Sequence, residues 1–100
     1  MSTTWKPHVK HGDLDTKDRE GLPDSVYAFP KQRKEPLTDA DHVRNALARF
    51  KQVTGVSDKD RDLAFANILD AAHHFGVRVD EKNWHELGKK QHAKNPTRAS

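Results

Sequence analysis

The stretch SDKDRDLAFANILDAAHHFG, residues 57–76, carries signals for both ends of a helix and for its burial. Ser57 followed by Asp60 is typical of a helix N-cap with an acidic partner, and Gly76 stands where a left-handed C-terminal cap would fall. Apolar residues recur at helical spacing along one side of this stretch, and further apolar residues lie on a second side. They predict a central helix at residues 57–75, covered from two directions. The first stripe is Phe65, Ile68, Ala72 and Phe75, and the residues off it are Leu63, Ala66 and Leu69.

The preceding residues, 38–54, predict a second helix. Thr38 with Asp41 resembles a capping box, and acidic residues suit the positive end of a helix dipole. Because Gly55 ends this helix shortly before Ser57, we expect the two helices to form a tight hairpin. The residues at the spacing of one helical face are Val43, Ala46, Leu47, Phe50 and Val53.

A third helix is expected at residues 80–88, after a short extended connection. Asp80 suits its N-cap position, and Gly88 would close it. Trp84 and Leu87 would face inward. Together the three helices predict an all-α fold, a small three-helix bundle.

Prolines divide residues 22–37, LPDSVYAFPKQRKEPL, which precede the helices. Pro23, Pro30 and Pro36 exclude a continuous helix and bias their neighbours to extended conformations. The segment is too apolar for a free linker, and the sequence shows no partner strand for it. We therefore expect an ordered, extended arm that braces the bundle.

The ends of the chain are polar and show neither helical nor strand periodicity. Residues 1–21 are expected to be a flexible leader and residues 89–100 a flexible basic tail, which leaves residues 22–88 as the helical domain. Trp5 is the exception in the leader, since a lone aromatic side chain can dock on a surface. We favour the alternative, a solvent-exposed Trp5.

Composition is typical of a small single domain with a thin core. The 100 residues are 33% hydrophobic and 33% charged, with a net charge of +3. There is no cysteine, which excludes disulfides, thiolate metal sites and cysteine nucleophiles. No apolar run approaches the roughly 20 residues needed to cross a bilayer, and the N-terminus lacks the apolar core of a signal peptide. We expect a monomeric cytoplasmic protein without membrane contact.

Catalytic and metal-binding motifs are missing from the sequence. There is no glycine-rich phosphate loop, GxSxG, HExxH or calcium-binding loop. Two pairs have ligand-like spacing, His8 with His11 and Asp70 with His74. A zinc site needs three or four converging ligands, and such spacings are common by chance. We therefore expect no catalytic residue, no cofactor and no metal ion.

Arg44, Asn45 and Arg49 are predicted on the outward side of the first helix. Asparagine is unfavourable inside a helix, which indicates a specific partner for Asn45. The favoured interpretation is that these side chains bind the backbone of the arm. The alternative is contact with nucleic-acid bases or phosphates. The basic side chains of the arm that would aid such contact are Lys31, Arg33 and Lys34.

The chain from Leu22 to Asp62 also resembles a small bacterial domain family of unknown function. The pattern of that family is LPDSxFAxP, then RxxP, then DxxHxRNALARF, and this chain reads LPDSVYAFP, RKEP and DADHVRNALARF. Tyr27 replaces the phenylalanine and keeps the ring. The resemblance extends to Leu87 if FGVRVDEKNWHEL is included. Members are short stand-alone bacterial proteins, related stretches occur in phage or prophage proteins, and the resemblance implies no activity, cofactor or catalytic residue.

These observations predict a non-enzymatic protein-interaction or assembly module with an unidentified protein partner. The alternative is weak, sequence-independent nucleic-acid binding through the basic arm and tail, with an affinity that falls steeply with salt. The expected contact surface is Tyr27, Lys31, Arg33, Lys34, Arg44, Asn45 and Arg49, and the basic residues of the tail are Lys89, Lys90 and Lys94.

Overall fold

The computed structural model describes residues 3–8 and 14–87 of the chain. These residues form three α-helices, two short strands and three 3₁₀ turns. The fold is therefore mixed α/β, and the predicted all-α three-helix bundle is wrong. The helices are α1 (Thr16–Glu20), α2 (Ala40–Arg49) and α3 (Asp58–Phe75), the strands are β1 (Tyr27–Phe29) and β2 (Lys34–Pro36), and the turns are η1 (Asp24–Val26), η2 (Phe50–Gln52) and η3 (Trp84–Glu86).

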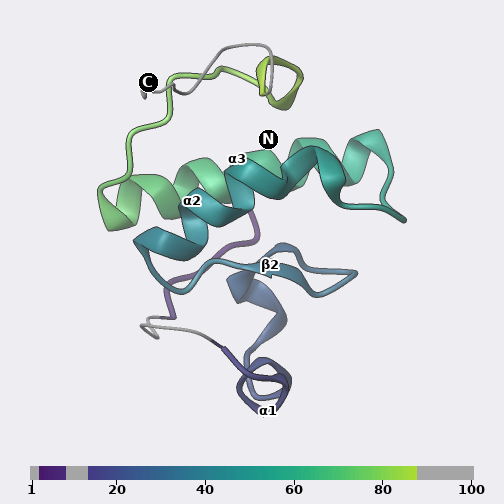
Figure 1. The fold of residues 1–100 in the computed structure, drawn as a ribbon, viewed down its shortest axis with the longest axis vertical. Helices are drawn as coiled ribbons and strands as arrows, with labels where there is room; N and C mark the ends of the chain where they lie inside the picture. Colours follow the sequence, from purple (N-terminus) through teal and green to yellow (C-terminus); the bar gives the residue numbers. More distant parts are fainter. Residues whose placement is uncertain (1–2, 9–13, 88–100) are drawn as a thin grey trace.

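Helices α2 and α3 lie side by side between the β1–β2 hairpin and the C-terminal segment, residues 77–87 (Figure 1). In that view the hairpin packs below the helices, and the C-terminal segment crosses above them. Strand β1 contacts α3 and β2 contacts α2, so the hairpin spans both helices. One face of the helix pair is thus covered by the sheet and the other by irregular chain.

Helix α3 forms where the sequence predicts it, at residues 57–75. The Ser57 hydroxyl accepts a hydrogen bond from Asp60 N, and the Asp60 carboxylate accepts one from Ser57 N, which completes a capping box. The bond from Ser57 N and another from Gln32 hold the pKa of the Asp60 carboxyl below its usual value. Gly76 ends the helix with a φ of 75°, the left-handed conformation that favours glycine. Buried residues of α3 are Ala64, Phe65, Asn67, Ile68, Ala71 and Ala72.

Helix α2 is shorter than the predicted helix at residues 38–54. Its N-cap is Asp39 and not Thr38, because the Asp39 carboxylate accepts a hydrogen bond of 2.8 Å from His42 N. Thr38 is fully buried, and its hydroxyl has no hydrogen-bond partner among the described residues. The regular helix ends at Arg49 and continues as the 3₁₀ turn η2, a common way for a helix to end.

The predicted extended arm is a β-hairpin. Strands β1 and β2 pair antiparallel, with Tyr27 opposite Pro36 and Phe29 opposite Lys34. Pro30 lies in the turn and Pro36 at a strand end, positions where a missing backbone N–H is tolerated. The expectation that this segment has no partner strand is therefore wrong.

The sequence of β2 explains why the strand was not predicted. Lys34, Glu35 and Pro36 have none of the β-branched or aromatic character typical of strands. Arg33 and Glu35 also have φ values of 52° and 58°, in a region that residues other than glycine rarely adopt. Pairing with β1 and packing on α2 hold these residues in place, and local propensity carries no sign of either.

The predicted third helix at residues 80–88 is reduced to the single turn η3 in the described part of the chain. Asn83 caps this turn and not Asp80, since the Asn83 side chain accepts a hydrogen bond of 3.0 Å from His85 N. Asp80 instead pairs with Arg78 at 2.9 Å. A side chain that binds its own neighbouring backbone favours a turn over a helix, and one isolated turn does not propagate.

The N-terminal segment, residues 3–8, packs against the core, although we expected a flexible leader there. Trp5 is 6% exposed, so the prediction of a solvent-exposed tryptophan is wrong. Its ring lies 5.6 Å from the ring of His74 and 5.9 Å from that of Phe75. The same leader contains α1, which begins with a capping box at Asp15. Part of the leader is therefore ordered structure.

The hydrophobic core centres on Phe50, which is fully buried where α2 passes into η2. Its ring lies 5.6 Å from that of Phe29 and 6.1 Å from those of Phe65 and Trp84. Tilted and edge-on ring contacts of this kind stabilise a core beyond the area they bury. One side chain thus joins the hairpin, α3 and the C-terminal segment.

Candidate interaction surface

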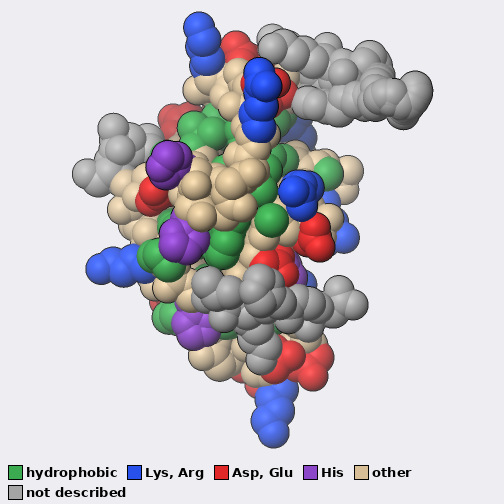
Figure 2. Space-filling view, turned by 90° about the vertical axis from the view of Figure 1, so that its left-hand side faces the viewer, with side chains coloured by type: hydrophobic (Ala, Val, Ile, Leu, Met, Phe, Trp, Pro, Cys, Tyr) green, Lys and Arg blue, Asp and Glu red, His purple; other side chains and the backbone are tan. Residues whose placement is uncertain are grey.

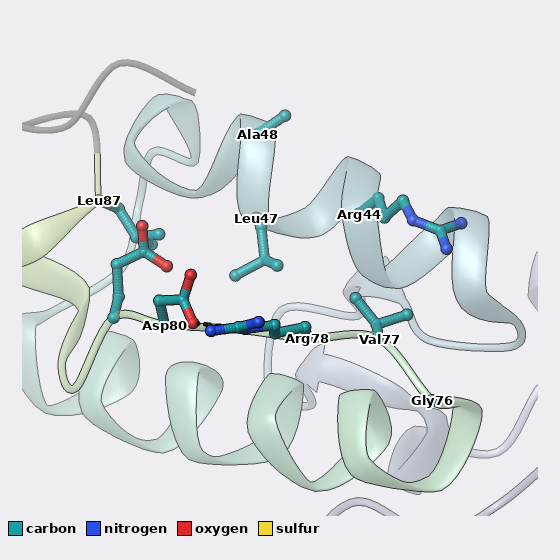
Figure 3. A pocket seen from close by; sticks show the side chains of 9 residues that line it. Arg44, Leu47, Ala48, Gly76, Val77, Arg78, Asp80 and Leu87 are labelled. Carbon is teal, nitrogen blue, oxygen red and sulfur yellow. Dashed lines mark hydrogen bonds and ion pairs between the residues drawn. The ribbon is translucent and has the colours of Figure 1, made fainter. Parts of the chain in front are cut away.

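A groove of about 670 Å³ runs between α2 and the C-terminal segment. Leu47 and Ala48 of α2 lie on one side of it, and Val77 and Leu87 of the C-terminal segment contribute apolar side chains from the other (Figure 3). A volume of several hundred Å³ is typical of sites that take a small ligand or a few side chains of a partner. The groove is therefore the candidate interaction surface.

The walls of the groove are fixed at both ends of the C-terminal segment. After the left-handed turn at Gly76, Val77 N donates a hydrogen bond of 2.8 Å to Ala72 O of α3. Near the other end, the Trp84 indole Nε1 donates to Asp62 Oδ1 at 2.8 Å. The groove is thus held open between two anchored points.

Charged side chains stand at both ends of the groove. Arg44 lies at the end near Gly76, and Asp80 lies at the end near Leu87 (Figure 3). Figure 2 shows the side of the molecule at which α3 ends, where hydrophobic side chains reach the surface between charged ones. A partner that fills the apolar part would therefore meet a cation at one end and an anion at the other.

Two exposed ion pairs hold Arg44, Arg78 and Asp80 of the groove lining. Arg44 pairs with Asp41 at 2.9 Å, with side chains that are 60% and 85% exposed. Arg78 pairs with Asp80 at 2.9 Å, with side chains that are 88% and 63% exposed. Such exposed pairs contribute roughly 0–1 kcal/mol each, so they do not prevent these charges from turning to a partner.

Two residues of the predicted contact surface are used inside the fold. Tyr27 is 1% exposed, and its hydroxyl donates to Arg19 O at 2.9 Å. The guanidinium of Arg33 lies over the Tyr27 ring at 4.8 Å and pairs with Asp24, which raises the pKa of Arg33 above its usual value. The same guanidinium donates to the carbonyls of Arg19 and Leu22 at 2.7 and 3.0 Å. Both side chains hold the hairpin against the chain that precedes it.

The two lysines of the hairpin differ in their freedom. Lys34 Nζ donates to Thr54 O at 2.9 Å, which ties β2 to the connection between α2 and α3. Lys31 is 79% exposed and lies 4.0 Å from Asp60. Of the two lysines, Lys31 is therefore the one that presents a largely solvated charge.

Arg44, Asn45 and Arg49 lie on the exposed face of α2, as predicted. In the part of the chain that the structure describes, none of the three makes a hydrogen bond to the backbone of the hairpin, so the interpretation that they hold the arm is wrong. The amide that does so is Asn67 of α3, which donates to Ala28 O at 3.0 Å. Of the predicted surface, only Arg44 lines the groove.

A smaller cavity of about 250 Å³ lies between β2 and the end of α2, with Lys34, Glu35 and Arg49 among its lining residues. Glu35 is half-buried there, and burial raises the pKa of its carboxyl. The positive charge of Arg49 is the largest effect that opposes this rise. Arg49 and Lys34 of the predicted surface thus lie near the Glu35 carboxyl, at a cavity separate from the groove.

Asn67 is the residue of most structural consequence that the sequence prediction missed. Its Oδ1 accepts hydrogen bonds from Thr4 N and Trp5 N at 2.9 and 3.0 Å. Its Nδ2 donates to Thr4 Oγ1 at 2.9 Å and to Ala28 O. The available signal was a polar residue within the buried stripe of a helix, where an amide needs partners.

No three histidine, aspartate or glutamate side chains of residues 3–8 and 14–87 lie together as a metal site would require. Among the same residues, no helix has the length and apolar character to cross a membrane. His11 and the basic tail with Lys89, Lys90 and Lys94 lie outside the described residues.

Residues 8–82 match a family described as one of unknown function, DUF6582. The match takes in the hairpin, α2 and α3, and most of the sequence on which the resemblance to a small domain family rests. It does not test the detailed pattern or the link to phage proteins. No curated protein and no solved structure matches the chain.

Proposed function

The chain belongs to DUF6582, a family of unknown function, and we propose that it is a non-enzymatic module that binds a segment of another protein in the groove between α2 and residues 77–87. The observation that carries the proposal is an apolar groove of about 670 Å³ with charges of opposite sign at its two ends. Apolar side chains of a partner give affinity in such a groove, and charges at the rim fix its direction.

The chemistry of the groove defines the partner segment. Leu47, Val77 and Leu87 suit one or two aliphatic or aromatic side chains. An acidic residue of the partner would lie against Arg44, and a basic one against Asp80. We propose further that the module is a cytoplasmic monomer. A more specific version of the proposal is a role in assembly, which the resemblance to stretches in phage proteins suggests.

Nucleic-acid binding has less support from the arrangement of charges. Arg33 is engaged with main-chain carbonyls, Lys34 is tied to Thr54 O, and the groove carries acids as well as cations. A phosphate-binding surface needs several cations on one face. In the described residues, the basic side chains of the predicted surface are divided among four places.

The test is selection of a displayed library of random 12-residue peptides on the full chain, with wild type and Val77→Arg compared. We expect enriched peptides that have apolar residues between an acid and a base, and we expect Val77→Arg to bind them at least tenfold more weakly. His73→Arg is the matched control, since it adds the same side chain at an exposed position of α3 outside the groove lining. Ala48→Arg serves as a second variant if Val77→Arg unfolds.

Binding of a DNA duplex, measured over a range of salt concentrations, distinguishes nucleic-acid binding from peptide binding in the groove. Peptide binding through an apolar groove should change little with salt, whereas phosphate-driven binding falls steeply as salt rises. Salt-sensitive binding of the duplex, with no peptide enriched, would overturn the groove in favour of nucleic-acid binding. Peptides that bind Val77→Arg and wild type equally would also overturn it.

A further inference from the structure

A second site lies on the opposite side of α3, where the N-terminal segment is seated between β1 and α3. We propose that this surface is a docking site for an extended Thr-Trp segment, and that the chain's own N-terminus fills it as an exchangeable intramolecular ligand. The docking surface is formed by Ala28, Leu37, Asn67, His74 and Phe75. This inference is independent of the groove and of the function proposed for it.

The backbone of the seated segment is recognised as that of a bound peptide would be. Asn67 Oδ1 accepts from the successive amides of Thr4 and Trp5 at 2.9 and 3.0 Å. Lys6 N then donates to Ser25 O at 3.0 Å, just before β1. Main-chain bonds of this kind give affinity for an extended segment without regard to its side chains.

Two side chains add selectivity. Thr4 Oγ1 accepts from Asn67 Nδ2 at 2.9 Å, a bond that an aliphatic residue could not make. The Trp5 indole Nε1 donates to Leu37 O at 3.2 Å, a bond that phenylalanine could not make. The ring itself is packed against His74 and Phe75. The ligand chemistry is therefore a hydroxyl residue followed by tryptophan.

The preceding residue extends the site by one position. The Thr3 hydroxyl donates to Asp70 Oδ2 at 2.8 Å, on the exposed side of α3. Every residue from Thr3 to Lys6 thus makes at least one hydrogen bond to the docking surface or to a residue beside it. Buried anchors at the centre and an exposed contact at one end are the pattern expected of a bound peptide.

The position of the segment in the chain argues that it is exchangeable. All hydrogen bonds described for residues 3–6 go to Ser25 or to residues beyond it. The docking surface lies within the family match at residues 8–82, whereas the residues that fill it precede the match. Without an occupant, Asn67 would keep only its bond to Ala28 and the Leu37 carbonyl would lose its donor. Another segment of the same chemistry would satisfy both.

The experiment uses the full chain and a fluorescently labelled peptide of residues 2–8. Trp5→Ala in the protein weakens the seated segment and should allow saturable binding of the peptide, measured by anisotropy. Wild type should bind at least tenfold more weakly, because a tethered occupant competes at an effective concentration of roughly millimolar. The same peptide with Trp5→Ala is the control for specificity and should not bind.

The result that would overturn the proposal is equal binding of the peptide to both proteins, or none to a folded Trp5→Ala protein. If Trp5→Ala unfolds, Trp5→Phe replaces it, since this variant keeps a ring and loses only the bond to Leu37 O. It should bind the peptide severalfold more tightly than wild type does. A folded Trp5→Phe protein that binds no better than wild type would show that the segment is a fixed part of the fold.

Discussion

The Asn67 side chain on α3 donates a hydrogen bond of 3.0 Å to the main-chain carbonyl of Ala28 on β1. Both residues are fully buried. The same amide binds Thr4 and Trp5, so one side chain joins three segments that lie far apart in the sequence. A buried amide with all of its bonds made specifies one packing, whereas unpaired partners would destabilise the fold.

Replacing Asn67 by alanine should therefore lower the free energy of unfolding by about 2–4 kcal/mol, because Ala28 O and the amides of Thr4 and Trp5 lose their partner. Chemical denaturation of the purified variants measures this. Asn45→Ala is the matched control, since Asn45 is exposed on α2, and its effect should stay within about 0.5 kcal/mol. Equal losses for the two asparagines would contradict the assignment.

Substituting an arginine of the hairpin should affect stability more than substituting an arginine of α2. Arg33→Ala removes hydrogen bonds to two carbonyls and a contact with the Tyr27 ring, and should lower the melting temperature clearly. Arg44→Ala removes only an exposed ion pair and should change the stability by less than about 0.5 kcal/mol. Thermal melts of both variants provide the measurement. A larger loss for Arg44→Ala would restore the view that this residue holds the hairpin.

The local signals in the sequence explain which parts of the fold could be predicted. The α3 helix was predicted because the Ser57 cap, the buried stripe and Gly76 all lie within the helix itself. The β2 strand was not, because its conformation depends on pairing with β1 and on two residues with positive φ. The order of Trp5 likewise depends on Asn67, a residue remote in sequence. Local patterns therefore identified elements that stabilise themselves and failed for those held by distant contacts.

The candidate site was harder to predict than the fold. Arg44 was placed on the correct face of α2, but the opposite wall of the groove arises from chain that was expected to be a helix. Asn45 and Asn67 carry the same signal, an amide inside a helix, and only burial distinguishes them. The stripe around Asn67 contained that information, since its helical neighbours are apolar.

The pKa of Glu35 makes the stability of the protein depend on pH. Burial raises the pKa of this carboxyl in the folded state above its ordinary value of 4.5, so folding favours the neutral form. The stability that the neutral Glu35 carboxyl contributes is fully present at pH values below that ordinary pKa. It is lost as the pH rises through the pKa of Glu35 in the folded state. The glutamine of Glu35→Gln stays neutral at every pH. The melting temperature of this variant should therefore rise relative to that of wild type as the pH rises from about 4 to about 7.

Arg49→Met provides a second test of the same effect. The positive charge of Arg49 opposes the rise in the pKa of Glu35, so its removal should strengthen the loss of stability with rising pH. The double variant with Glu35→Gln should not show this additional pH dependence. Parallel melting curves for wild type and Glu35→Gln across the pH range would sink the explanation.

The two glycines with left-handed conformations offer a matched test of the groove. Gly55 and Gly76 both have a φ of 75°, and a Cβ placed on either would meet no atom within 4 Å. Alanine at either position should therefore cost about 1 kcal/mol of stability through backbone strain alone.

Their effects on binding should differ, because Gly76 begins the turn that carries residues 77–87 over α2, whereas Gly55 joins α2 to α3 and does not line the groove. Gly76→Ala should lower the affinity for the peptides selected on the groove severalfold. Gly55→Ala should leave that affinity unchanged, although both variants lose the same stability. Gly76→Asn should recover much of the loss, since asparagine tolerates the left-handed region. If both alanine variants weakened the peptides equally, the loss would follow from stability and not from the path of the C-terminal segment.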